Sequence, residues 1–142
     1  MSLEENKTVI RRWFEEMNKG NMAAVDEFYG ADYVLHDPNV PPDLPRGPAS
    51  VRRYLAPIMA GFPDSSVTVD DVIAEGDKIA VRFTARGNHT GDFMGIPPSG
   101  KPIEARGISI IRIADGQMVE EWQNFDILTL LQQIGAIPTM AE

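Results

Sequence analysis

The side chain with the clearest potential for chemistry is Asp126, in the stretch MVEEWQNFDILTLLQQ (Met118 to Gln133). It lies between Phe125 and Ile127, where a pattern typical of a strand gives way to one typical of a helix. A carboxylate among apolar residues is poorly solvated, which raises its pKa and suits it to carry protons near neutral pH. The alternative interpretation is that Asp126 caps the helix that follows, a role that Asp often fills.

The strand before Asp126 carries other polar groups that would accompany such a carboxylate. Alternation places Trp122, Asn124 and Asp126 on one side of the strand, and we expect this side to line a cavity and to bind a substrate. The opposite side carries Val119, Glu121, Gln123 and Phe125. Which face of the neighbouring strand joins the cavity stays open, because a β-bulge would shift the register.

Three further polar side chains are candidates, each with a structural alternative. Arg82, within IAVRFTA, is either a pocket cation or an arginine on an exposed sheet face. His36 precedes a proline-rich loop and is either a catalytic proton carrier at a pocket rim or a turn residue bonded to the local backbone. For His89, beside a turn, we expect a structural hydrogen-bonding role. With two histidines and no cysteine, we expect no metal site.

The elements that must position these residues begin with an amphipathic helix over residues 4–18. Its apolar stripe includes Trp13, Phe14 and Met17. We expect these three side chains to belong to the core and also to contact a ligand, because a helix that covers a pocketed sheet does both. A second short helix is predicted over residues 22–29.

The remaining pattern predicts a third helix over about residues 48–60 and then antiparallel hairpins. The predicted strands cover residues 32–36, 66–74, 78–89, 101–113 and 117–125, and a last helix covers 127–133. The loop at residues 38–48 contains five prolines, and we expect it to form a lid or pocket rim. Helices followed by hairpins predict one α+β domain over residues 1–142.

Composition narrows the classes of function. The chain has 13 basic and 21 acidic residues, a net charge of -8 that argues against nucleic-acid or anionic-membrane surfaces. It lacks cysteine, which excludes disulfides and thiolate nucleophiles. The opening MSLEENKTVIRRWF has no apolar signal segment, and no apolar run approaches membrane-spanning length. We therefore expect a cytoplasmic protein.

Two stretches resemble a known family: RFTARGNHTGDFMGIPPSGK (Arg82 to Lys101) and DGQMVEEWQNFDILTLLQQIG (Asp115 to Gly135). They are similar to the SnoaL-like polyketide cyclases, within the nuclear-transport-factor-2-like superfamily, and the likeness covers nearly the whole chain. It implies a strongly bent sheet that the N-terminal helices wrap into a cone with an apolar pocket. It also implies a homodimer or a homotetramer.

The resemblance further implies a reaction. Asp126 would be the general acid/base of an intramolecular aldol closure on an apolar, carbonyl-bearing small molecule, with no cofactor and no metal. The enolate formed on the way needs a hydrogen-bond donor, for which Trp122, Asn124, His36 and Arg82 are candidates. The same scaffold carries steroid isomerases, epoxide hydrolases and binding or dimerisation modules without turnover, so these alternatives stay open.

Overall fold

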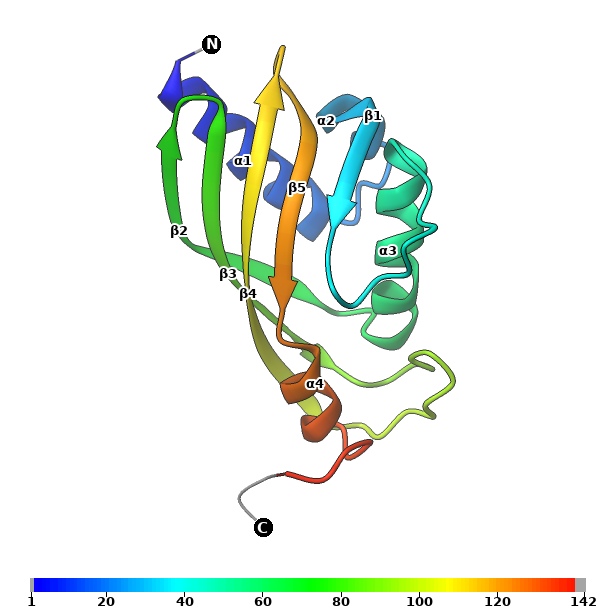
Figure 1. Cartoon of the computed structure of the whole chain (residues 1–142). Coiled ribbons are helices and arrows are strands. Elements are labelled where there is room, and N and C mark those ends of the chain that lie inside the picture. Colours follow the sequence, from blue (N-terminus) through cyan, green and yellow to red (C-terminus); the bar gives the residue numbers. More distant parts are fainter. Residues whose placement is uncertain (1, 140–142) are drawn as a thin grey trace.

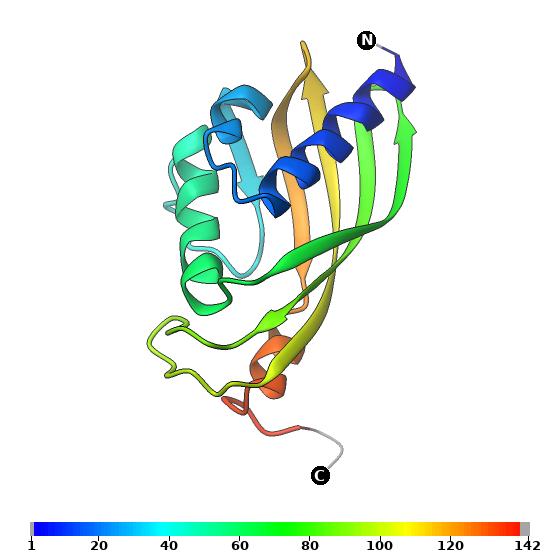
Figure 2. The same cartoon turned by 180° about the vertical axis from the view of Figure 1, so that it is seen from behind.

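The computed structural model describes residues 2–139, in which four helices accompany one five-stranded sheet (Figure 1). The elements in chain order are α1 (Leu3–Asn18), α2 (Ala24–Phe28), β1 (Tyr29–His36), α3 (Pro48–Gly61), β2 (Ser66–Glu75), β3 (Lys78–Asn88), β4 (Pro102–Ala114), β5 (Gln117–Phe125) and α4 (Ile127–Gln133). The strand order is β1-β5-β4-β3-β2. The predicted α+β class is confirmed, with α1 crossing one face of a bent sheet (Figure 2).

Helix α1 begins with a capping box. The Ser2 hydroxyl accepts the backbone N–H of Glu5 at 3.1 Å, and the Glu5 carboxylate accepts the N–H of Ser2 at 3.1 Å. At the other end, the Asn18 side-chain amide pairs with both the N–H and the carbonyl of Val67 in β2, each at 2.8 Å. The capping box closes the first turn of α1, and the Asn18 pair attaches its last turn to the sheet, with the apolar stripe on the inner side.

Two features differ from the prediction, namely the length of α2 and the direction of β1 relative to β5. Helix α2 is shorter than expected, because Tyr29 already begins β1 by pairing with Met118 of β5. Strands β1 and β5 run parallel, which makes the sheet mixed, whereas hairpin patterns predicted only antiparallel pairs. Helix α3 covers nearly the predicted range and continues through Pro57 to Gly61. The helical carbonyl that this proline leaves without a partner belongs to Arg53, which is exposed, so water can hydrogen-bond to it.

A β-bulge in β5 interrupts its pairing with β4. The two strands pair as Ile113 with Met118, and then as Arg112 with Glu120. Val119 is therefore an extra residue without an opposite partner. Every side chain of β5 after Val119 points to the face opposite to the one that an uninterrupted register would give it.

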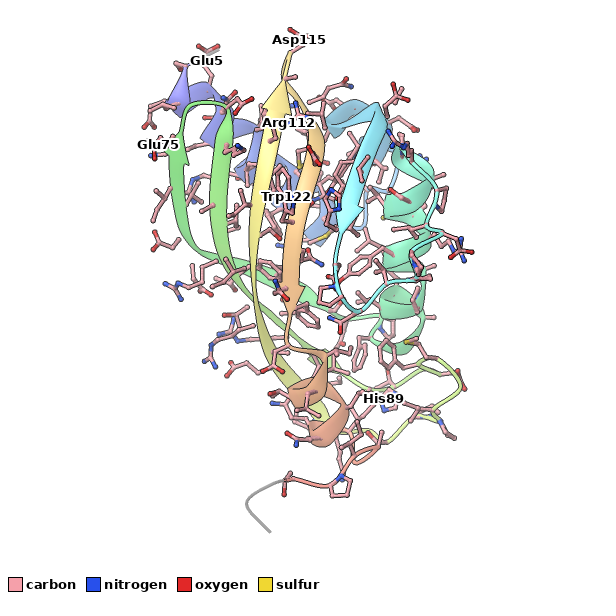
Figure 3. All side chains as sticks on the ribbon, in the orientation of Figure 1. Glu5, Glu75, His89, Arg112, Asp115 and Trp122 are labelled. Carbon is pink, nitrogen blue, oxygen red and sulfur yellow. The ribbon has the colours of Figure 1, made fainter. Side chains whose placement is uncertain are left out.

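The bulge decides what the inner face of the sheet presents. Ile111 and Ser109 of β4 are 2% exposed and face inward. With the bulge they oppose Glu121 and Gln123; without it Ser109 would oppose Trp122. Glu121 and Gln123 therefore point inward, and Trp122 points outward, onto the face turned to the viewer in Figure 3.

Buried side chains form two clusters. The larger one lies between the inner face of the sheet and helices α1 and α2, with Ile10, Val25 and Val81 fully buried. The smaller one includes Phe62 and Leu130, and joins the end of α3 to α4 and to the segment before β4. None of the helices described within residues 2–139 is long and apolar enough to cross a membrane.

Candidate active site

A cavity of about 450 Å³ lies between the inner face of the sheet and helices α1 and α3. Its apolar lining includes Trp13, Phe14, Met17, Val51, Leu55, Ile58, Phe83, Ile111 and Phe125. The volume and the apolar wall are typical of sites for small molecules. Trp13, Phe14 and Met17 of the α1 stripe pack in the core and also line this cavity, and their contact with a ligand stays a prediction.

A single carboxylate, Glu121, faces into this cavity among the lining residues. It is only 6% exposed, and its Oε1 accepts a hydrogen bond from the Tyr33 hydroxyl at 2.7 Å. Burial raises the pKa of Glu121, and the negative charge of Asp37 acts in the same direction, while the hydrogen bond from the Tyr33 hydroxyl opposes the shift. Glu121 therefore has the two properties of a general acid/base: access to a ligand and a pKa moved towards neutrality.

A second polar group lies beside Glu121 and is centred on Gln123. The Gln123 side-chain nitrogen donates to Asp37 Oδ2 at 2.8 Å and to the Tyr54 hydroxyl oxygen at 2.7 Å. Its side-chain oxygen accepts from the Ser109 hydroxyl at 3.3 Å. Burial raises the pKa of Tyr33 well above its usual range and, together with the nearby Asp37, raises that of Tyr54, so both phenols stay protonated at neutral pH.

Asp126 does not lie in the cavity, and the predicted placement is wrong. It is exposed and caps α4: Oδ1 accepts the Thr129 N–H at 3.0 Å, and Oδ2 accepts the Thr129 hydroxyl at 2.6 Å. These hydrogen bonds to Thr129 lower the pKa of Asp126, whereas an acid/base role would need it raised. The structure therefore confirms the alternative interpretation, in which Asp126 caps the helix that follows.

The polar side chains predicted to join Asp126 are also outside the cavity. Trp122 and Asn124 lie on the outer face of β5, because the bulge at Val119 reverses the expected alternation. Arg82 is half-exposed on the same outer face, 3.9 Å from the Asp70 carboxylate. For Arg82, the alternative of an arginine on an exposed sheet face is the one observed.

The two histidines have different surroundings. His36 is exposed on the outer face, where its Nε2 lies 2.8 Å from the Glu120 carboxylate and its ring stacks on Trp122 at 5.5 Å. It is neither at the cavity nor bonded to the local backbone, so neither interpretation of His36 describes it. His89 is fully buried, and its Nδ1 accepts the backbone N–H of Ser99 at 3.1 Å, which confirms its structural role.

The loop at residues 38–48 contributes no side chain to the cavity wall, so its expected role as a rim of this pocket is wrong. The loop contacts the sheet through Asn39, whose side-chain amide donates to the carbonyl of Phe125 at 3.0 Å, and through Gly47, whose backbone N–H donates to the carbonyl of Tyr33 at 2.8 Å. Within residues 2–139, no three His, Asp or Glu side chains come close enough together to hold a metal ion.

Glu121, Gln123, Tyr33 and Tyr54 are the residues that sequence reasoning missed. The signal for the first two was the alternation in β3, where Ile79, Val81 and Phe83 are apolar and buried. The inward residues of β3 identify those of β5 only when the bulge in the pairing of β4 with β5 is known. No residue type in β5 indicates this bulge. The two tyrosines reach the site from β1 and α3, and their sequence context carries no such signal.

Comparison with known proteins gives a consistent result. A family model described as SnoaL-like polyketide cyclase matches residues 7–134. The aklanonic acid methyl ester cyclase DnrD of Streptomyces peucetius is 25% identical over 133 residues, which cover 89% of this chain and 88% of that protein.

Solved structures agree with the sequence comparison. IdmH of Streptomyces antibioticus, named as a candidate polyketide cyclase, is 34% identical with a TM-score of 0.81, covering 92% of this chain and 98% of that one. AclR of Streptomyces galilaeus, named as a candidate hydroxylase, is 25% identical with a TM-score of 0.85, covering 98% of this chain and 86% of that one.

Proposed function

The chain belongs to the SnoaL-like polyketide cyclase family, and from that premise we propose that it is a cofactor-independent cyclase in which Glu121 is the general acid/base. The substrate would be an apolar small molecule with two carbonyl groups flanking an acidic carbon. The observation that carries the proposal is the position of Glu121: it is a buried carboxylate with a raised pKa that faces an apolar cavity of about 450 Å³.

The proposed reaction is an intramolecular aldol closure. The Glu121 carboxylate takes a proton from the carbon between the two carbonyls, and the enolate carbon then bonds to a ketone carbon of the same molecule. The C=O of that ketone becomes an alkoxide, which receives the proton back from Glu121. A pKa raised by burial suits both steps, because a proton carrier works best when its pKa lies near the operating pH.

The experiment that tests this proposal is turnover of the compound named for the relative DnrD. We expect purified protein without added cofactor to cyclise aklanonic acid methyl ester, or a smaller β-keto ester with a second ketone. The product is an isomer of the substrate with the same mass, so chromatography and NMR are the measurements that distinguish the two. A protein that is stabilised against heat by such compounds, yet never forms product, would instead support a binding module.

We also propose that the outer face of the sheet joins two copies of the chain, as a homodimer or as part of a homotetramer. One cross-strand row on this face runs through Ile73, Ala80, Ile110, Trp122 and His36. Ile73, Ile110 and Trp122 are 61%, 44% and 37% exposed, and Ile108 beside them is 55% exposed. Exposed apolar side chains gathered on one sheet face are typical of an association surface.

The charges around this row suit a second copy of the same surface. Arg112 pairs with Glu120 on one side of the row at 3.3 Å, and Arg86 pairs with Glu104 farther along the other side at 2.8 Å. Because both signs are present, a two-fold axis can bring basic residues of one copy near acidic residues of the other.

A charge placed in the row tests this association. We expect Ile110→Glu to raise the dissociation constant of the dimer on the order of 100-fold, because an unpaired carboxylate would lose its water in the interface. The measurement is light scattering or sedimentation over a concentration series. Leu128→Glu is the matched control, since Leu128 is 47% exposed on α4, outside the row. A wild-type protein that is monomeric at micromolar concentration contradicts the proposal.

A further inference from the structure

The orientation of the Gln123 amide is determined by its neighbours. Asp37 accepts N–H groups on both carboxylate oxygens, from the Asn39 backbone at 2.7 Å and from the Gln123 nitrogen at 2.8 Å. A carboxylate can only accept hydrogen bonds, so the amide nitrogen of Gln123, and not its oxygen, must face Asp37. The Ser109 hydroxyl donates to the amide oxygen on the other side.

This orientation determines what the Tyr54 hydroxyl can do. The Gln123 nitrogen lies 2.7 Å from the Tyr54 oxygen and can only donate, so the Tyr54 oxygen is the acceptor. The phenolic proton must then point away from Gln123. Within residues 2–139 the Tyr54 hydroxyl donates to no protein group, and the side chain lines the cavity. The proton is therefore available to whatever occupies the cavity.

The other two tyrosines of the cavity wall lack this combination. The Tyr33 proton is already donated to Glu121 Oε1 at 2.7 Å, so it is committed to the protein. Tyr29 also lines the cavity, but its hydroxyl makes no hydrogen bond with the part of the chain that the structure describes. Nothing in the protein orients the Tyr29 proton, whereas that of Tyr54 is oriented before a ligand arrives.

We propose that Tyr54 is the binding subsite for an acceptor oxygen of the ligand, namely a ketone, an ester carbonyl or an enolate, and that Gln123 and Asp37 are its positioning residues. The inference rests on the proposed function, because it supplies the enolate donor that an acid/base at Glu121 requires. It also defines the ligand class: the atom facing Tyr54 must accept a hydrogen bond, so a ligand with only a C–H group there is discriminated against.

A matched pair of tricyclic probes tests the subsite without any turnover. Fluorenone and fluorene share one skeleton, and only fluorenone carries a carbonyl oxygen. We expect the wild-type protein to bind fluorenone more tightly than fluorene. We expect Tyr54→Phe to weaken fluorenone binding about threefold to tenfold, as the loss of one neutral hydrogen bond should, and to leave fluorene binding within about twofold.

A spectroscopic signature accompanies the change in affinity. A hydrogen bond to a carbonyl lowers its stretching frequency, so bound fluorenone should show a lower frequency in the wild-type protein than in Tyr54→Phe. Tyr29→Phe is the comparison variant, and it should preserve both the preference for fluorenone and the frequency. A merely structural role of Tyr54 would change the binding of both probes and would not move the carbonyl frequency.

Asp37→Asn tests whether Asp37 and Gln123 position the Tyr54 hydroxyl. In Asp37→Asn the oxygen that binds the Asn39 N–H is kept, and the new amide nitrogen faces Gln123, which must turn its own oxygen toward residues 37 and 54. Tyr54 would then donate its proton to Gln123. We expect the fluorenone preference to fall as far as in Tyr54→Phe, although Tyr54 is intact, and the double variant to lose nothing more.

The outcomes separate this inference from the proposed function. An unchanged preference and frequency in Tyr54→Phe overturns the subsite, while the role of Glu121 is judged by turnover and stands independently. Loss of the preference in Tyr29→Phe, with Tyr54→Phe unchanged, overturns it in favour of Tyr29. A wild-type protein that binds neither probe contradicts both the subsite and the apolar ligand of the proposed function.

Discussion

Replacing Glu121 by Gln should lower kcat by about 10²- to 10⁴-fold, the range that general acid/base catalysis contributes. Gln keeps nearly the same shape and can still accept the Tyr33 hydroxyl, whose bond to Glu121 measures 2.7 Å. It cannot take or return a proton. KM should change much less than kcat, because the apolar cavity wall that binds the ligand is untouched. The measurement is steady-state turnover with the substrate that the wild-type protein cyclises.

Asp126→Asn is the matched control, because it makes the same chemical change at the other candidate carboxylate. Asp126 is exposed and bonded to Thr129, and it lies outside the cavity. Asn also caps helices, so the variant should fold and keep kcat within about threefold of wild type. If Asp126→Asn lost turnover while Glu121→Gln kept it, the acid/base would be Asp126 and our assignment would be overturned.

The difference between these two candidates shows how far the sequence could lead. Residue patterns predicted α1, α3, the two hairpins and α4 nearly to the residue, because each depends on local periodicity and turn signals. The family resemblance predicted the bent sheet and the cavity. The inward position of the α1 stripe followed from its spacing alone, since a helix with one apolar face has only one way to cover a sheet.

The identity of the inward carboxylate could not be predicted, because it depends on one unpaired residue. The bulge at Val119 places Glu121 inside and Trp122 outside, and an unbroken register would do the reverse. A bulge is a property of the pairing between two strands, and the sequence of either strand gives no sign of it. The parallel pairing of β1 with β5 was missed for a related reason: the two strands are far apart in the chain, and no local turn fixes their relative direction.

The burial of Glu121 should also make the stability of the protein depend on pH. Its pKa is raised in the folded state above the ordinary value of 4.5, mainly by desolvation. Between the unfolded and the folded pKa, the unfolded chain has released this proton while the folded protein still holds it. The free energy of unfolding therefore falls as pH rises through this window and becomes constant above the folded pKa. Each unit by which the pKa is raised costs about 1.4 kcal/mol at high pH.

Glu121→Gln removes this cost, because a neutral amide replaces the buried charge. We expect the variant to unfold at a higher temperature than wild type at pH 8, with a gain of roughly 3–5 °C for each kcal/mol removed. The gain should shrink toward zero at pH 4, where Glu121 is mostly protonated in both states. The measurement is thermal unfolding of the two proteins across this pH range, and their difference isolates Glu121 from the other titrating groups.

Asp126→Asn should show the opposite dependence, because the folded pKa of Asp126 is lowered and its contribution to stability is lost as pH falls. A gain for Glu121→Gln that stays the same at both pH values would mean that Glu121 is not the buried carboxylate with a raised pKa on which the proposed catalysis depends. A gain confined to high pH would mean that the protein gives up stability to hold this group in its cavity.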